Sequence, residues 1–234
     1  MTPADPRIQD PPERVLDIWK SAQAVCFDVD STLCEDESID ELAAFLGVGD
    51  EVAAMTASAM GGTVLFQDAL RQRLDIMQTS QQKVQEFLAA HPPRISRGIP
   101  ELVDLLQSRG TGVFLVSGGF RVIIDPIADI LKIPRDHVFA NKILFNEDGS
   151  YAGFDETELT SRSGGKAAAA RLIKEKYGYS TLVMVGDGAT DLEARQPGGA
   201  DIFIGYGGVV ERPTIAGKAD WYIYNIESLI AALR

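Results

Sequence analysis

The sequence predicts an α/β fold: a doubly wound, mainly parallel sheet with a helical cap inserted after the first strand and a small β-hairpin. The sheet is predicted because short, continuously apolar runs alternate along the chain with segments of helical periodicity. The cap is predicted because the segment 36–96 contains helical patterns and no convincing strand. The hairpin is indicated by Asp148-Gly149, which lies between two β-favouring runs in the segment 138–156.

The first expected strand is the apolar run at 24–27, and a short amphipathic pattern at 15–20 precedes it. Four further apolar runs are expected as strands, at 112–116, 181–185, 201–204 and 221–223. Between these runs, helical periodicity is found at 101–109, 122–131 and 166–177. Strands that alternate with helices favour right-handed crossovers and therefore a parallel sheet.

The segment between the first two expected strands interrupts this alternation. Ile39, Leu42 and Leu46 recur there at helical spacing, and Thr79 or Ser80 can cap a further helix. A helical module that enters and leaves near the carboxyl end of a strand is well placed to cover an active site. The expected division is a disordered tail at 1–12, a catalytic α/β core at 13–35 and 97–234, and a helical cap at 36–96.

Composition restricts the partners of this protein. The 234 residues carry a net charge of −12, which repels phosphate backbones and anionic headgroups, so neither nucleic acid nor a membrane is expected as a partner. No run approaches the roughly 18 apolar residues that span a bilayer, and the proline-rich tail resembles neither a secretory signal nor a transit peptide. We therefore expect a soluble, cytoplasmic protein, and the sequence leaves a homodimer open.

Cysteine and histidine are scarce in this chain. Cys26 and Cys34 are the only cysteines and do not form a C-x-x-C pair, which excludes a thiolate metal cluster and fits a reducing compartment. His91 and His137 are the only histidines, too few for a histidine-rich zinc site. Acid and base chemistry must therefore come mainly from carboxylates or lysine.

Carboxylates gather where two of the expected strands end. Asp28 and Asp30 follow the first strand, and Asp187 and Asp191 follow the run at 181–185. Because the carboxyl ends of parallel strands meet at one edge of the sheet, these acids would repel one another unless a cation neutralises them or some are protonated. Oxygen ligands without histidine or cysteine favour a hard ion such as Mg²⁺.

Two further features indicate an anion site. Ser117, Gly118 and Gly119 follow the run at 112–116, and the backbone N–H groups of glycine residues can approach a ligand closely. Lys166 lies at the start of an expected helix, where a cation is unfavourable unless an anion lies nearby. Taken alone, the first feature is also compatible with an ordinary strand-to-helix turn, and the second with a solvated surface lysine.

Taken together, the ordered motifs resemble those of the haloacid dehalogenase superfamily of phosphohydrolases. The motifs are Asp28-x-Asp30-x-Thr32, Ser117, Lys166 and Gly186-Asp187-Gly188-x-x-Asp191. Further segments resemble the branch of this superfamily that hydrolyses O-phosphoserine in the last step of serine biosynthesis: Ile39-Asp40-Glu41-Leu42, Met60-Gly61-Gly62, Val116-Ser117-Gly118-Gly119-Phe120 and Tyr151-Ala152-Gly153-Phe154. The resemblance implies a magnesium-dependent phosphatase that acts on a small-molecule phosphoester.

The resemblance also implies catalytic roles for the matching acids. Asp28 would be the nucleophile that becomes a phosphoaspartate, and Asp30 would donate and then accept the transferred proton. Asp28, the backbone carbonyl of Asp30 and Asp187 would hold Mg²⁺. Asp191 would orient Lys166 or a water on the metal.

The substrate contacts follow from the same resemblance. Glu37 would bind the amino group of phosphoserine and Arg73 its carboxylate, although most exposed charges on helices are only solvated. The remaining substrate contacts would be made by Met60, Gly61, Ser117, Gly118, Gly119, Lys166 and Thr190.

Two other functions stay open at this point. The protein could hydrolyse another small phosphoester or pass the phosphoryl group to an alcohol. It could also be a signalling module whose Asp28 is phosphorylated by a partner. Asp30, which is placed to destroy an acyl phosphate, and the predicted cap both argue against the signalling role.

Overall fold

The computed structural model describes residues 10–59 and 65–234. Most of the predicted tail at 1–12 lies outside these residues. Met60 and Gly61, two of the predicted substrate contacts, also lie outside them.

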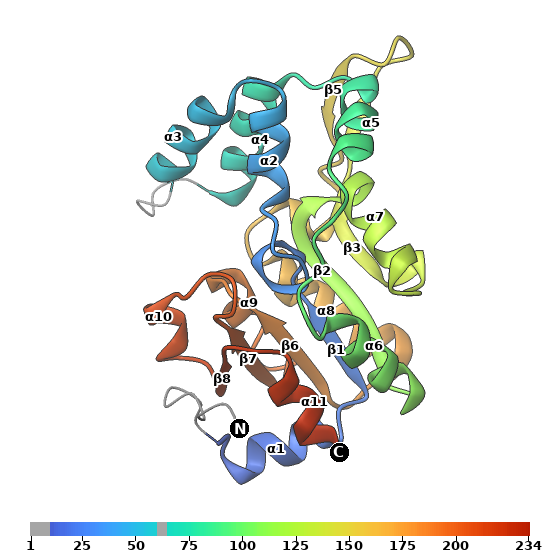
Figure 1. Ribbon diagram of the computed structural model, residues 1–234, viewed down its shortest axis with the longest axis vertical. Coiled ribbons are helices and arrows are strands. Elements are labelled where there is room, and N and C mark those ends of the chain that lie inside the picture. The colour runs from blue at the N-terminus through green and yellow to red at the C-terminus, as the bar shows by residue number, and fades with distance from the viewer. Residues whose placement is uncertain (1–9, 60–64) are drawn as a thin grey trace.

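A six-stranded parallel sheet in the order β3-β2-β1-β6-β7-β8 forms the centre of the structure (Figure 1). Its strands are β1 (Ala24–Phe27), β2 (Gly112–Phe120), β3 (Val138–Asn141), β6 (Leu182–Gly186), β7 (Ile202–Tyr206) and β8 (Trp221–Ile223). β1 pairs with both β2 and β6, so Phe27 lies between Leu115 and Val185. The segments that follow these three strands therefore leave the sheet at one edge, which confirms the predicted α/β sheet.

Helices cover both faces of the sheet, because alternate strand residues point to opposite sides. One face packs Val25 and Phe27 against helices α1 (Glu13–Lys20), α6 (Ile99–Ser108), α7 (Arg121–Ile130) and α11 (Glu227–Leu233). The other face packs Cys26 and Met184 against α8 (Gly165–Tyr177) and α10 (Pro213–Ala216). Within the described part of the chain, no helix combines the length and the apolar character that crossing a membrane requires.

Among the described residues, four α-helices lie between β1 and α6 in the sequence and stand beyond the carboxyl ends of β1 and β2 (Figure 1). They are α2 (Ser38–Phe45), α3 (Gly49–Ala59), α4 (Phe66–Met77) and α5 (Gln81–Ala90). Leu42, Leu70 and Phe87 from these helices pack with Phe120 of the core and Phe154 of the hairpin. This arrangement confirms the helical cap as a part of the fold, whereas its division from the core at residues 36 and 96 stays a prediction.

The hairpin is shorter than predicted. It consists of β4 (Ile143–Phe145) and β5 (Tyr151–Phe154), which pair antiparallel. The first β-favouring run of the segment 138–156 instead forms β3, an edge strand of the main sheet. Local pattern cannot tell which partner a strand pairs with, because the same run of residues fits either sheet.

β2 is longer than the predicted strand at 112–116, because it continues through Phe120. Ser117, Gly118 and Gly119 therefore lie within the strand rather than in a turn after it. The register against β3 shifts between Val116 and Phe120, so the pairing is irregular where the glycines occur. This irregular end of β2 is the part that faces the site described next.

Candidate active site

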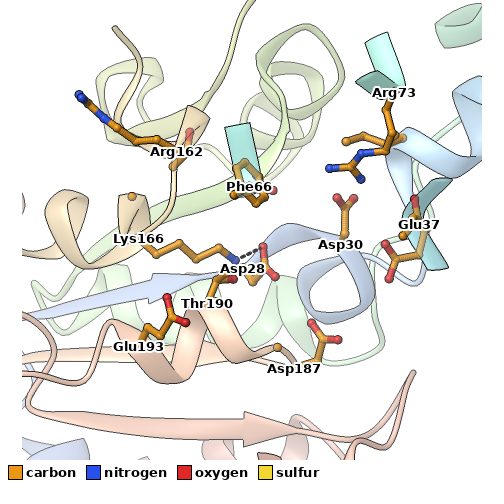
Figure 2. A pocket seen from close by; sticks show the side chains of 18 of the residues that line it. Asp28, Asp30, Glu37, Phe66, Arg73, Arg162, Lys166, Asp187, Thr190 and Glu193 are labelled. Atoms are coloured by element: carbon orange, nitrogen blue, oxygen red, sulfur yellow. Dashed lines mark ion pairs between the residues drawn. The ribbon is translucent and has the colours of Figure 1, made fainter. Parts of the chain in front are cut away.

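A cavity of about 240 Å³ lies between the carboxyl edge of the sheet and the cap helices (Figure 2). Its walls come from the core and from helices α2, α3 and α4. The predicted site residues that line it are Asp28, Asp30, Glu37, Arg73, Ser117, Gly118, Lys166, Asp187 and Thr190. The structure therefore brings together residues that are far apart in the sequence.

Asp28 is the first residue after β1, and its side chain is held firmly. Its Oδ1 accepts a hydrogen bond from the Val29 N–H at 2.7 Å and pairs with Nζ of Lys166 at 2.9 Å (Figure 2). Both contacts are made by Oδ1. Among the described residues, Oδ2 has no hydrogen-bond partner, so this oxygen is available for attack on a substrate.

Lys166 is the second residue of α8 and is buried between two carboxylates. Besides Asp28, it binds Oδ1 of Asp191 at 2.6 Å. Burial lowers the pKa of Lys166, but the charges of Asp191 and Asp28 raise this pKa by more, so the ammonium group stays protonated. The predicted conflict with the helix dipole is therefore already relieved by the two carboxylates of the protein.

Asp191 and Asp187 come from the segment after β6. Asp191 is fully buried, and its Oδ2 accepts a hydrogen bond from the Gly188 N–H at 3.0 Å. Gly186 is required beside it, since a Cβ there would clash with Cγ of Asp191. Oδ1 of Asp187 accepts a hydrogen bond from the Thr32 hydroxyl at 3.3 Å. Both acids are thus fixed in place before any ligand binds.

The carboxylates of Asp28, Asp187 and Asp191 are buried, and their ligand oxygens lie within 4.8 Å of one another. Burial and the charge of Asp28 raise the pKa of both Asp187 and Asp191. The part of each shift that comes from Asp28 is like-charge repulsion, which a bound cation would relieve. A hard divalent cation with oxygen ligands fits this donor set. Asp191 is fully buried and does not line the cavity, whereas Asp28 and Asp187 do, so Asp28 and Asp187 are the better candidate ligands.

Asp30 lies beside Asp28 on the side of the cavity that faces Arg73 and Glu37 (Figure 2). Burial, followed by the charges of Asp28 and Glu37, raises the pKa of Asp30 to about 7. Asp30 therefore lies between Asp28 and these two charged residues (Figure 2).

The end of β2 supplies further hydrogen-bonding groups to the wall of the cavity. Ser117 is buried, and its Oγ accepts a hydrogen bond from the Gly119 N–H at 3.0 Å. The Gly118 carbonyl accepts a hydrogen bond from Nδ2 of Asn141 at 2.8 Å, which anchors this strand end to β3. A Cβ at Gly118 would lie only 3.0 Å from Cζ of Phe66, so glycine lets this cap residue close over the strand.

Glu37 and Arg73 both face into the cavity (Figure 2). Oε1 of Glu37 accepts a hydrogen bond from the Ser31 hydroxyl at 2.6 Å. Ser31 has a φ of 52°, a left-handed conformation that costs a residue with a Cβ about 1–2 kcal/mol. Burial lowers the pKa of Arg73, and the charges of Asp40, Asp30 and Glu37 oppose this effect. The two side chains are therefore held within the site and are not ordinary surface charges.

Arg212 is a site residue that the sequence reasoning missed. Its Nε binds Oδ2 of Asp187 at 2.8 Å, and it lines the cavity. It belongs to the loop after β7, and that loop matches none of the quoted motifs. Like the predicted acids, Arg212 follows an apolar run that is expected to form a strand. This position in the sequence was the signal that could have indicated it. Other lining residues outside the predicted set are Ile39, Asp40, Thr56, Phe66, Thr160, Arg162, Gly164, Gly165, Gly188 and Glu193.

Comparisons with known proteins agree with this geometry. The family model of the haloacid dehalogenase-like hydrolases matches residues 22–199. The chloroplastic phosphoserine phosphatase of Arabidopsis thaliana is 56% identical over 223 residues, which are 95% of this chain and 76% of that protein. The structure of DsGPDH of Dunaliella salina is similar, with a TM-score of 0.85 and 39% sequence identity. The match covers 97% of this chain and 38% of that chain. A substrate-bound phosphoserine phosphatase is similar with a TM-score of 0.77 and 28% identity, covering 92% of this chain and 99% of that chain. The chain therefore belongs to the haloacid dehalogenase-like hydrolases and, among them, to the phosphoserine phosphatase family.

Proposed function

We propose that this enzyme hydrolyses O-phosphoserine to serine and phosphate through an aspartyl phosphate on Asp28, the last step of serine biosynthesis. One observation carries the proposal: Glu37 and Arg73, which have opposite charges, line the same cavity as Asp28 and Lys166. One end of the cavity thus suits a phosphate, and the other suits an amino group and a carboxylate. The shared name of the similar proteins supports the same substrate.

In the first step, Oδ2 of Asp28 attacks phosphorus and the bond from phosphorus to the serine oxygen breaks. The electron pair of that bond stays on the serine oxygen, which takes a proton from Asp30. Lys166, the Ser117 hydroxyl and the Gly118 N–H bind the remaining phosphate oxygens, on which charge is spread in the transition state.

In the second step, water attacks phosphorus of the aspartyl phosphate. Asp30 accepts a proton from this water, and the electron pair of the breaking bond returns to the carboxylate of Asp28. Asp30 thereby regains the proton that it gave up in the first step. Asp191 holds Lys166 in place through the whole cycle, and Thr190 lines the cavity beside it.

Asp28, Asp187 and the backbone carbonyl of Asp30 would hold Mg²⁺, which would offset the repulsion between the carboxylates and the incoming phosphate. Removal of divalent cations with a chelator is therefore expected to abolish phosphate release, and added Mg²⁺ is expected to restore it. Ca²⁺ should restore it poorly, because it prefers more oxygen ligands at longer distances. Phosphate release measured with each cation tests this, and equal activity in chelator and Mg²⁺ would contradict it.

Asp30→Asn is expected to slow both steps, because an amide cannot exchange the proton. A loss of about 10²–10⁴-fold in kcat is typical for an acid/base group. Mg²⁺ affinity should hardly change, since the proposed ligand at this position is the backbone carbonyl. Titration calorimetry checks this second point: a collapse of Mg²⁺ affinity would make the Asp30 side chain a ligand and remove its proposed acid/base role.

A panel of phosphomonoesters, assayed with and without added alcohol, tests the proposed substrate and reaction. We expect O-phosphoserine to be preferred and free phosphate to be the main product. A different preferred ester, or transfer of the phosphoryl group to the alcohol, would favour one of the alternative enzyme functions. A phosphoaspartate that persists for minutes would favour the signalling role. The cytoplasmic location and the possible homodimer stay predictions.

A further inference from the structure

The carboxylate of Asp30 is held by a residue of the cap. Ser38, the first residue of α2, donates its backbone N–H to Oδ1 of Asp30 and its hydroxyl to Oδ2, each over 3.1 Å. Ser38 is only 5% exposed, so water competes little for these bonds. Two donors from one residue fix both the position and the tilt of the carboxylate.

The neighbouring strand leaves room for this contact. A Cβ at Gly119 would lie 3.0 Å from Oγ of Ser38, 3.2 Å from Oδ2 of Asp30 and 3.2 Å from Oγ of Ser117. Glycine at this position lets the three side chains converge over the end of β2. The bond between Ser38 and Asp30 therefore lies beside the proposed phosphate-binding serine, at the reacting end of the cavity.

Without Ser38, the orientation of Asp30 would be poorly determined. The negative charges of Asp28 and Glu37 repel its carboxylate, whereas Arg73 attracts it from the cap side. In Figure 2 the Asp30 carboxylate faces the Arg73 guanidinium, and Asp28 lies on the other side of Asp30. The two hydrogen bonds from Ser38 select one orientation among these competing ones.

We propose that Ser38 is a positioning residue for the proposed reaction: its hydroxyl holds Asp30 where a proton can pass from the Asp30 carboxyl to the departing serine oxygen. The inference rests on the proposed function. In this step the bond from phosphorus to the serine oxygen breaks, its electron pair stays on that oxygen, and the proton of Asp30 neutralises it. Because Ser38 begins α2, the same contact ties the cap to proton transfer.

Two substrates separate this role from general damage to the site. The alkoxide of serine needs the proton in order to leave, whereas p-nitrophenolate leaves without one. The ratio kcat/KM covers only the steps up to departure of the alcohol, so hydrolysis of the phosphoaspartate does not affect it. Ser38→Ala is expected to lower kcat/KM for O-phosphoserine about tenfold, the effect of one lost hydrogen bond to a charged group. For p-nitrophenyl phosphate we expect a change of less than about twofold.

Conservative and matched variants complete the test. Ser38→Thr keeps the hydroxyl and should restore kcat/KM for O-phosphoserine to within about twofold of the parent. Its extra methyl has room, because Ser38 also lines a cavity of about 80 Å³ between α5 and α7. Ser80→Ala is the control: Ser80 caps α5 by accepting a hydrogen bond from the Lys83 N–H at 3.2 Å and does not line the active-site cavity. This variant should leave both substrates unaffected.

The inference is overturned if both substrates fall equally, if neither falls, or if Ser38→Thr does not restore activity. If Ser38→Ala does not fold, Ser38→Cys provides the same contrast, because a thiol of similar size is a weaker donor. Failure of the parent protein to release phosphate from O-phosphoserine would be seen before any variant is compared. That result would refute the proposed function, and so it is distinct from a failure of the inference about Ser38.

Discussion

Asp28→Asn is expected to remove turnover, with a fall in kcat on the order of 10⁴-fold or more. The amide fills the same space and leaves Lys166 paired with Asp191, so the fold should be kept. It cannot form the acyl phosphate, however, because the amide nitrogen and carbonyl are poor nucleophiles. The measurement is phosphate release from O-phosphoserine, together with the thermal unfolding midpoint of the variant.

Asp129→Asn is the matched control for the nucleophile. Asp129 is an exposed acid that pairs with Arg135 and does not line the cavity, so its loss should leave kcat unchanged. A fall of less than about tenfold for Asp28→Asn, which is about 1.4 kcal/mol of barrier, would show that another group is the nucleophile.

Arg73→Ala and Glu37→Gln are expected to destroy the preference for O-phosphoserine. Loss of one partner of a buried charged contact costs about 2–5 kcal/mol, which corresponds to a fall in kcat/KM of tens to thousands of fold. Arg73→Lys should also weaken phosphoserine use, because lysine cannot form the two parallel hydrogen bonds that a guanidinium makes with a carboxylate. The same variants should hardly change kcat/KM for a phosphoester without amino and carboxylate groups, which is a poor substrate from the outset.

Arg71→Ala controls for changes to helix α4. Arg71 lies on the same helix, is 51% exposed at its side chain and pairs with Glu156 outside the cavity. We expect no change in the ratio of the two substrates for this variant. Equal falls for both substrates in Arg73→Ala would instead indicate that Arg73 supports the fold or the phosphate site. No fall for either substrate would remove the main physical support for phosphoserine.

The sheet and the positions of the acids at its carboxyl edge were predictable because their signals are local. An apolar run such as 24–27 is typical of a buried parallel strand, and the acids behind two such runs must reach one edge of the sheet. The helical cap was predictable for the same reason, since Ile39 and Leu42 recur at helical spacing. The placement of Asp28, Lys166, Asp187 and other distant residues around one cavity followed from these elements and from the motif resemblance.

Other features depend on contacts between distant segments and could not be predicted. The run at 138–141 fits either a hairpin or a sheet edge, and only tertiary packing decides between them. Nothing local indicates that Ser31 adopts a positive φ to hold Glu37, or that Arg212 reaches Asp187 from the loop after β7. Ser38 likewise has the sequence signature of an ordinary residue in the first turn of a helix, and its contact with Asp30 becomes visible only in three dimensions.

The most direct test of the account is to trap the covalent intermediate. The protein is mixed with phosphate-labelled O-phosphoserine and Mg²⁺, quenched in acid within milliseconds, digested and mapped by mass spectrometry. The account predicts label on Asp28 alone, an intermediate that decays at least as fast as kcat, and release of serine and phosphate in equal amounts. Label on another residue would contradict the account. So would turnover without any labelled protein under conditions in which formation of the intermediate is not rate-limiting.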